Sequence, residues 1–128
     1  MKLTKFYSKK MTKKILKIGI ASKEEIHQRM IDIASGKYKV KSGDPKIWFT
    51  SMSSLAQVLS DENRTLLNMI KNMEPSSISE LASLSGRKQS NLSRTLKTMS
   101  SYGLVKMEPC QRALKPIVQA DSFQIFAY

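Results

Sequence analysis

Residues 85–105 read SGRKQSNLSRTLKTMSSYGLV, and the polar side chains in this stretch are unevenly placed. Leu92, Leu96 and Met99 recur at the spacing of one helix face, which predicts a helix over residues 88–101. Gly103 suits the left-handed position that ends such a helix. Basic and hydrogen-bonding side chains crowd the start of the helix on its other side: Arg87, Lys88, Gln89, Ser90, Asn91 and Arg94. The pattern predicts a helix with an apolar side for a support and a polar side for a partner.

The residues before this stretch predict its support. Residues 61–73 form an amphipathic pattern that buries Leu66, Leu67, Ile70 and Met73, starts at Ser60 or Asp61, and stops at Pro75. A short helix then follows over residues 78–85. Ser77 and Glu80 have the spacing of a capping box at its start. Gly86 permits the tight turn between this helix and the next one.

The residues after the stretch predict strands around a basic loop. Residues 104–108 favour a strand, residues 109–116 a loop that carries Arg112 and Lys115, and residues 117–127 further strands. The order helix, helix, turn, helix, strand, basic loop, strand is typical of a winged helix–turn–helix. In that fold the third helix enters the major groove of DNA, where base edges are distinguishable by hydrogen bonding.

This fold assigns a role to each polar residue of the stretch. Gln89 and Asn91 have the donors and acceptors that adenine recognition needs, and arginines pair with guanine or phosphate. We expect the wing to reach neighbouring phosphates or the minor groove. The predicted DNA-binding residues are Arg87, Lys88, Gln89, Ser90, Asn91, Ser93, Arg94, Lys97, Arg112 and Lys115.

The charge of the chain fits a polyanionic partner. The 128 residues carry a formal net charge of +12. Residues 1–17 contain seven Lys and no acid, whereas residues 18–74 are nearly neutral. All basic residues after position 74 fall between Arg87 and Lys115, where Glu108 is the only acid. The excess therefore lies in a basic tail, residues 1–14, and in the predicted DNA-binding part. Met11 is a second candidate start residue, which leaves the tail's role open.

The near-neutral segment, residues 15–59, predicts a strand–helix–strand element. Residues 15–20 alternate as a strand, and Ser22 with Glu25 predicts a capping box for a helix that ends at Gly36. Ile26, Met30 and Ile33 form the apolar face of this helix. Residues 46–50 favour a second strand that pairs with the first, and residues 52–59 a short helix with Leu55, Val58 and Leu59 apolar.

We expect this element to hold a homodimer, since one helix–turn–helix reads too few base pairs to find a site alone. Adjacent strand residues face opposite ways, so one of Trp48 and Phe49 should lie in the core and the other at the surface. Simple packing is the expected role of these rings, and a place near the dimer contact is the alternative.

Residues 15–121 also resemble the MarR/ArsR-like winged helix–turn–helix regulators, and most closely the small predicted regulators that include TumA-type antitoxins of toxin–antitoxin systems. The resemblance rests on Phe49-Thr50-Ser51 with Leu55, on Gly86-Arg87, on residues 91–96 (NLSRTL), on residues 103–105 (GLV), and on Arg112 to Pro116. It implies a repressor or antitoxin that regulates its own operon and a possible cognate toxin as partner.

Other classes of protein find little support in the sequence. A Cys/His zinc site needs about four ligands, and the chain has one histidine, His27, and one cysteine, Cys110. No Gly-rich phosphate loop occurs, and no pair among the scattered carboxylates stands out as acid and base, so we expect no enzyme, cofactor or metal. No apolar run is long enough for a membrane helix and no signal peptide is recognisable, which predicts a cytoplasmic protein.

The sequence therefore predicts an α+β protein: a winged helix–turn–helix over residues 60–128 with a small N-terminal strand–helix–strand element over residues 15–59. The predicted function is sequence-specific binding of double-stranded DNA. Two alternatives stay open, namely a protein-interaction adaptor whose basic face meets an acidic partner, and an RNA-binding winged-helix module.

Overall fold

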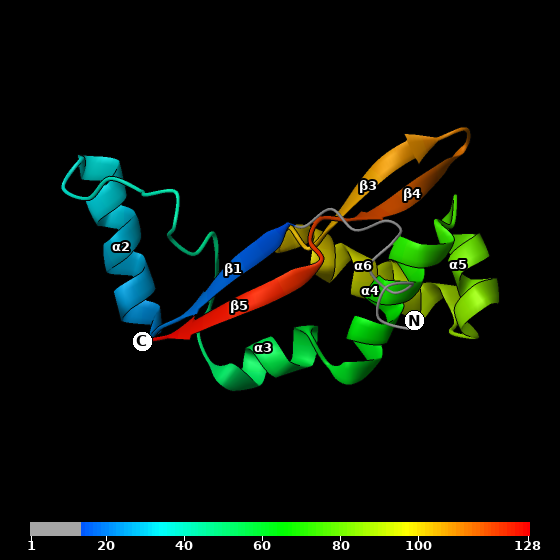
Figure 1. The fold of residues 1–128 in the computed structure, drawn as a ribbon, viewed down its shortest axis with the longest axis horizontal. Helices are drawn as coiled ribbons and strands as arrows, with labels where there is room; N and C mark the ends of the chain where they lie inside the picture. The colour runs from blue at the N-terminus through cyan, green and yellow to red at the C-terminus, as the bar shows by residue number, and fades with distance from the viewer. Residues whose placement is uncertain (1–13) are drawn as a thin grey trace, which may run out of the picture.

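The computed structural model describes residues 14–128, and the predicted basic tail lies outside these residues apart from Lys14. The described part has an α+β fold of five helices and five strands in two sheets (Figure 1). Along the chain these elements are β1 (Ile15–Ile20), α2 (Lys23–Ser35), β2 (Ile47–Phe49), α3 (Met52–Val58), α4 (Asp61–Met73), α5 (Ile78–Ser85), α6 (Gln89–Ser101), β3 (Val105–Cys110), β4 (Ala113–Val118) and β5 (Ser122–Ala127).

The first sheet joins the two ends of the described chain. Its strand order is β2-β1-β5, and both pairs are parallel. The predicted pairing of β1 with β2 is confirmed, with Ile18 opposite Ile47. The strand β5 returns from the C-terminal part and pairs along all of β1, from Ile15 opposite Ser122 to Ile20 opposite Ala127. The sheet therefore crosses the predicted boundary at residue 60.

Aromatic side chains connect this sheet to the helices. Phe49 is 2% exposed, and its ring stacks on the ring of Tyr102, just after α6, with centroids 4.4 Å apart. Trp48 lies on the opposite face of the strand, half-buried, as the alternation predicts. Its ring lies against Gly19, where an added Cβ would overlap the indole. Because Phe49 is enclosed in the core, it has no surface to offer a dimer contact.

The helix α2 differs from its prediction in what it buries. Its ends are as expected: Ser22 and Glu25 form a capping box, and Gly36 ends the helix in a left-handed conformation. However, no residue of α2 is buried. Met30 is 64% exposed, Ile33 is 37% exposed and Ile26 is half-buried, so the predicted apolar face is not enclosed in the core. Figure 1 shows the reason, because α2 stands beyond one end of the sheet instead of lying across it.

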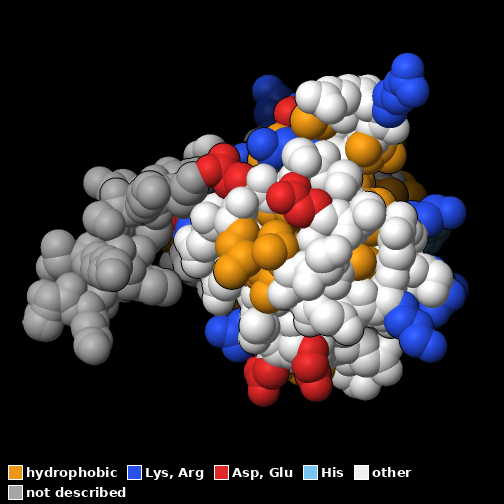
Figure 2. Space-filling model, turned by 90° about the vertical axis from the view of Figure 1, so that its right-hand side faces the viewer, with side chains coloured by type: hydrophobic (Ala, Val, Ile, Leu, Met, Phe, Trp, Pro, Cys, Tyr) orange, Lys and Arg blue, Asp and Glu red, His pale blue; other side chains and the backbone are white. Residues whose placement is uncertain are grey.

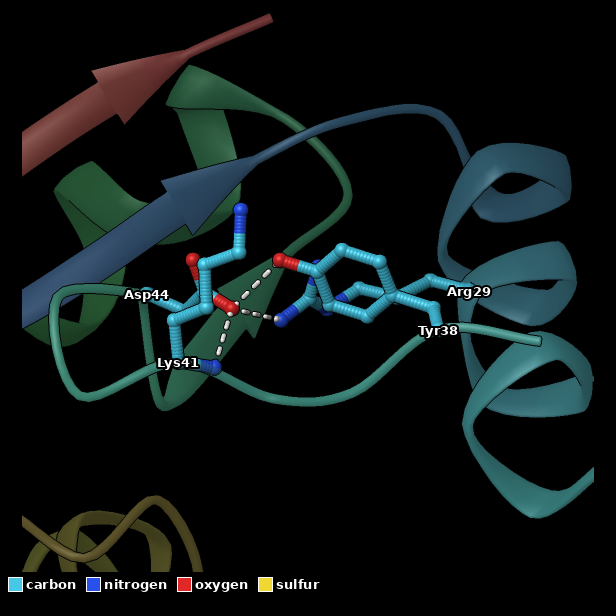
Figure 3. Close-up of polar contacts among 4 residues, drawn as sticks. All are labelled: Arg29, Tyr38, Lys41 and Asp44. Carbon is cyan, nitrogen blue, oxygen red and sulfur yellow. Dashed lines mark hydrogen bonds and ion pairs between the residues drawn. The ribbon is translucent and has the colours of Figure 1, made fainter. Parts of the chain in front are cut away.

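A polar cluster connects α2 to the loop before β2 (Figure 3). The carboxylate of Asp44 accepts hydrogen bonds from the Tyr38 hydroxyl at 2.6 Å, the Lys41 backbone N–H at 2.9 Å and the Arg29 guanidinium at 3.3 Å. The Arg29 guanidinium also lies 4.9 Å from the ring centre of Tyr38 and 5.0 Å from that of Trp48. Attachment of α2 through these contacts is therefore polar and aromatic instead of aliphatic.

The helices α4, α5 and α6 share one apolar core. The predicted contacts of Leu92, Leu96 and Met99 are confirmed in kind, since all three are at most 1% exposed and cluster with Leu66, Ile70 and Leu81. Leu55 of α3 is buried as well, with Val58 and Leu59 packed against the same cluster. Met73 was expected in this core but is 57% exposed. It is the last residue of α4, beyond the turn that the core covers.

None of the helices within residues 14–128 has the length and apolar character needed to cross a membrane. The same residues contain no cluster of His, Cys, Asp or Glu side chains able to hold a metal ion. His27 is exposed on α2 and Cys110 is half-buried at the end of β3.

Candidate nucleic-acid interface

The turn between α5 and α6 is built from local signals in the sequence. The Ser77 hydroxyl accepts the Glu80 backbone N–H at 3.0 Å and begins α5. In a capping box, the Glu80 carboxylate would accept the backbone N–H of Ser77 in return. Here it accepts instead the backbone N–H and the hydroxyl of Ser76, at 2.6 and 2.9 Å. These two bonds lower the pKa of Glu80. Gly86 then ends α5 at φ 74°, the left-handed region that glycine enters without strain.

The start of α6 has no side-chain cap. Lys88 occupies the N-cap position, and its side chain makes no capping hydrogen bond. The first backbone N–H groups of the helix are therefore unoccupied by a cap, and such groups attract anions such as phosphate. Because Lys88 is itself exposed, a positive side chain stands next to these N–H groups.

The outer side of α6 carries most of the predicted contacts. Four predicted DNA-binding residues are exposed on α6, and their spacing of three and four residues places them on one side of the helix: Ser90, Ser93, Arg94 and Lys97. Gln89 is exposed in the first turn. Neither Arg94 nor Lys97 forms an ion pair with any acid in the described part of the chain. We call the side chains of Lys88, Gln89, Ser90, Ser93, Arg94 and Lys97 the α6 polar face.

Two predicted base-reading residues have a different arrangement. Arg87 and Asn91 are half-buried, and the Arg87 guanidinium donates to the Asn91 side-chain oxygen from Nε at 3.1 Å and from Nη2 at 2.9 Å. Nη1 of Arg87 donates to the side-chain oxygen of Asn63 in α4 at 3.4 Å. A bidentate contact to adenine uses the acceptor and the donor of one amide. Since Arg87 occupies the Asn91 acceptor, this pair braces the turn in the present conformation.

Asn63 is a member of this arrangement that sequence reasoning missed. Its amide nitrogen donates to the backbone carbonyl of Val58 at 3.1 Å, so it connects the end of α3 to the turn before α6. A signal was present: Asn63 precedes Leu66, Leu67 and Ile70 by three, four and seven residues, on the apolar face of α4. A polar residue at such a position needs hydrogen-bond partners when it is covered.

The predicted basic loop at residues 109–116 is wrong in its extent. The strands β3 and β4 form an antiparallel hairpin that continues to the pair Cys110 opposite Ala113, which leaves a two-residue turn. Gln111 in that turn has φ 57°, and Arg112 is exposed beside it. Residues expected in the loop thus belong to the strands, and Pro109 and Pro116 are accommodated in this two-stranded sheet.

The two predicted DNA-binding residues of the hairpin, Arg112 and Lys115, have different surroundings. Lys115 lies opposite Glu108 in the hairpin register, and its charge contributes to lowering the pKa of Glu80. Glu108 also forms an ion pair with Lys106 at 3.3 Å. Arg112 at the tip has no ion pair within residues 14–128. Of these two residues, Arg112 at the tip is therefore an uncompensated cation, whereas the charge of Lys115 is partly neutralised by neighbouring acids.

The end of the molecule formed by the helices and the hairpin has an uneven charge (Figure 2). On this face Lys and Arg side chains line the right-hand edge and also occur at the top and at the lower left, whereas Asp and Glu lie above the centre and at the lower edge. A hydrophobic patch lies left of the centre, between the upper and the lower acidic side chains. The right-hand edge of this end is thus basic without acidic neighbours in the same view.

Comparison with known proteins gives one match. A family model, HVO_A0114, matches residues 58–125, which is more than half of the chain and includes α4, α5, α6, β3 and β4. No curated protein and no solved structure matches the chain. The resemblance to MarR/ArsR-like and TumA-type regulators is therefore untested and stays a prediction. On the strength of the matched residues, the chain belongs to the HVO_A0114 family.

Proposed function

We propose that the chain is a sequence-specific DNA-binding transcriptional regulator of the winged helix–turn–helix type, in which α6 enters the major groove and the β3–β4 hairpin is the wing. It acts as a homodimer in the cytoplasm and represses its own operon. If a toxin is encoded beside it, the chain is the antitoxin of that pair.

One observation carries the proposal: the α6 polar face holds unpaired cations on a helix whose other side is fully anchored. Leu92 and Met99 are 0% exposed, which fixes the helix against its support. Arg94 and Lys97 are exposed and make no ion pair among the described residues. A cation that no acid neutralises is available to release counterions from DNA.

The structure also refines the roles within this proposal. Gln89 and Ser90 are exposed in the first turn of α6 and are the base-reading candidates. Arg94, Lys97 and Lys88 contact phosphates or guanine, and Arg112 contacts the backbone from the hairpin tip. Arg87 and Asn91 serve mainly to hold the start of α6 in position. The adaptor and RNA-binding alternatives lack a specific supporting observation, so they enter as outcomes of the experiment.

The experiment measures binding to the DNA upstream of the chain's own gene over a range of salt concentrations. Each lost phosphate contact should reduce the log–log salt slope by about 0.9. We expect the Arg94→Gln/Lys97→Gln double variant to bind more weakly and to show a slope smaller by about twice that amount. The control is Lys23→Gln/Lys37→Gln, which removes the same charge from exposed residues far along the chain from α6.

Three outcomes would contradict the proposal. Equal loss in both double variants would indicate attraction to net charge without a defined face. Tighter binding to duplex RNA of the same sequence would favour the RNA-binding alternative. No binding to nucleic acid at low salt, together with binding to an acidic protein, would favour the adaptor.

A further inference from the structure

The strand β5 has one edge without a partner strand in the described part of the chain. It is the last strand in the order β2-β1-β5. Tyr128, which follows β5, donates its backbone N–H to the Ile20 carbonyl at 2.8 Å. The N–H and C=O groups of the even-numbered residues in β5 therefore point toward β1. Backbone groups alternate between the two edges of a strand. Phe123, Ile125 and Ala127 therefore direct theirs to the free edge.

A groove of mixed polarity runs beside this edge. It has a volume of about 620 Å³ and lies between α3, α4 and β5. Its lining is apolar at Met52, Leu55, Leu59, Phe123 and Ile125, and it is polar or charged toward α4, at Arg64, Asn68 and Lys71. Met52 is 58% exposed and Ile125 48% exposed, which is high for side chains of a groove wall. The groove thus offers exposed apolar side chains of α3 and β5 at the place where the side chains of a fourth strand would lie.

The strand β5 also lacks the features that keep edge strands apart. Proteins protect such edges with charged residues, proline, bulges or a covering segment. The sequence SFQIFA has no charge and no proline, and its pairing with β1 is regular over six residues. In a chain of net charge +12, this uncharged strand is a surface at which two copies approach without direct repulsion between like charges.

We propose that the occupant of this edge is β5 of a second copy, paired antiparallel across a two-fold axis, so that two three-stranded sheets become one sheet of six strands. A two-fold contact uses the same patch on both copies, and an antiparallel strand pair satisfies that condition. A register with Ile125 opposite Ile125 and Phe123 opposite Ala127 uses all three outward-facing residues of each copy. In this arrangement the side chains of Phe123 and Ile125 from one copy lie beside the groove of the other.

This inference deepens the proposed function by locating its dimer contact, and it moves that contact from the predicted residues 15–59 to β5. It differs from a dimer formed by the exposed apolar residues of α2, which is the strongest competing surface. Its experiment contains no DNA, so its failure is distinguishable from failure of the DNA-binding proposal.

The first measurement is the mass of the full chain by light scattering at micromolar concentration. We expect the mass of two chains for the wild type and for Met30→Lys, which changes α2. We expect the mass of one chain for Ile125→Lys, because two lysines then face each other across the axis. Circular dichroism checks that each variant is folded. A monomeric wild type, or a dimer that Met30→Lys dissociates and Ile125→Lys does not, overturns the proposal.

The second measurement is amide hydrogen exchange, which needs no variant. In the dimer the outward amides of Phe123, Ile125 and Ala127 should exchange slowly, and dilution below the dissociation concentration should raise their rates at least tenfold. The amides of Phe126 and Tyr128 face β1 and serve as internal controls whose protection should not depend on concentration. Fast exchange of the outward amides in a dimeric sample, or protection that persists on dilution to monomer, would show that β5 does not pair with a second copy.

Discussion

The two regions of the molecule place their apolar and polar residues in opposite ways. In the region from α4 to β4, the apolar face of α6 is enclosed against α4 and α5, and the polar face of α6 projects from this support. In α2, by contrast, the apolar side chains of Met30, Ile31 and Ile33 are exposed, and a cationic side chain, Arg29, makes the contact with the rest of the protein. The apolar residues recur at helical spacing in both α6 and α2, but they are enclosed only in α6.

The difference teaches that an amphipathic pattern identifies a helix and not its partner. The apolar face of α6 finds α4 and α5, which are adjacent in the chain and joined to it by short turns. No such layer lies across α2 in the described part of the chain, since β2 follows it into the sheet and α3 packs against β2. The polar residues of α6 thus stand exposed on a packed scaffold, whereas Met30, Ile31 and Ile33 of α2 stand exposed without a packed layer over them.

The largest effect should come from truncating apolar residues in the two regions. Leu96→Ala removes a side chain that is 1% exposed, and such changes cost about 2–5 kcal/mol. Met30→Ala changes a side chain that is 64% exposed and should stay within about 0.5 kcal/mol of the wild type. Urea unfolding of both variants measures the free energy of unfolding. Similar losses would mean that α2 is packed against something in solution.

A smaller effect should separate bracing from base reading in the turn before α6. Arg87→Ala leaves the covered oxygens of Asn91 and Asn63 without their donor, which should cost about 1–3 kcal/mol of stability. Asn91→Ala removes the acceptor from the other side. The double variant should then lose less than the sum of the two single losses, with a coupling of at least about 0.5 kcal/mol.

A comparison of Asn91→Ala with Gln89→Ala also tests the role of Asn91 in DNA binding. If Asn91 braces the turn, Asn91→Ala should weaken operator and random DNA to a similar degree, whereas Gln89→Ala should reduce operator preference only. Additive stability losses together with a loss of preference in Asn91→Ala would restore Asn91 as a base-reading residue and break the contrast between scaffold and polar face.

Sequence reasoning succeeded where the signal is local. Ser22, Ser60 and Ser77 begin helices, and Gly36 and Gly86 end them, because a cap depends on backbone groups within four residues. The buried face of α6 was equally predictable from its spacing. The α+β class and the pairing of β1 with β2 follow from the same kind of pattern.

The features that sequence reasoning missed depend on residues far apart in the chain. The pairing of β5 with β1 joins residues separated by 107 positions, and Lys14 with Asp121 shows the same separation at the start of the pair. The alternation in FQIFA predicts a strand but does not indicate which strand pairs with it. Likewise, the Arg87 side chain reaches Asn63 only when α4 and α6 are packed together. The sequence shows only its charge and its place before the helix, and these indicated a DNA contact instead of the bonds to Asn91 and Asn63.

The smallest effect should come from the carboxylate that attaches α2 to the loop. The Lys41 backbone N–H, the Tyr38 hydroxyl and the Arg29 guanidinium favour the charged form of Asp44 and lower its pKa from 3.8 to about 2. A lowered pKa stabilises the folded form above the unfolded pKa, and this contribution is lost as pH falls from about 4 through 2. We expect carboxyl-carbon NMR to give an Asp44 midpoint near 2 in the wild type and a higher midpoint in Tyr38→Phe, which lacks the hydroxyl donor. Since only α2 and its loop depend on this carboxylate, the amide signals of α6 should not follow the Asp44 midpoint. A wild-type midpoint at its ordinary value would mean that α2 is not attached through Asp44, and coupled changes in α6 would mean that the two regions respond as one unit.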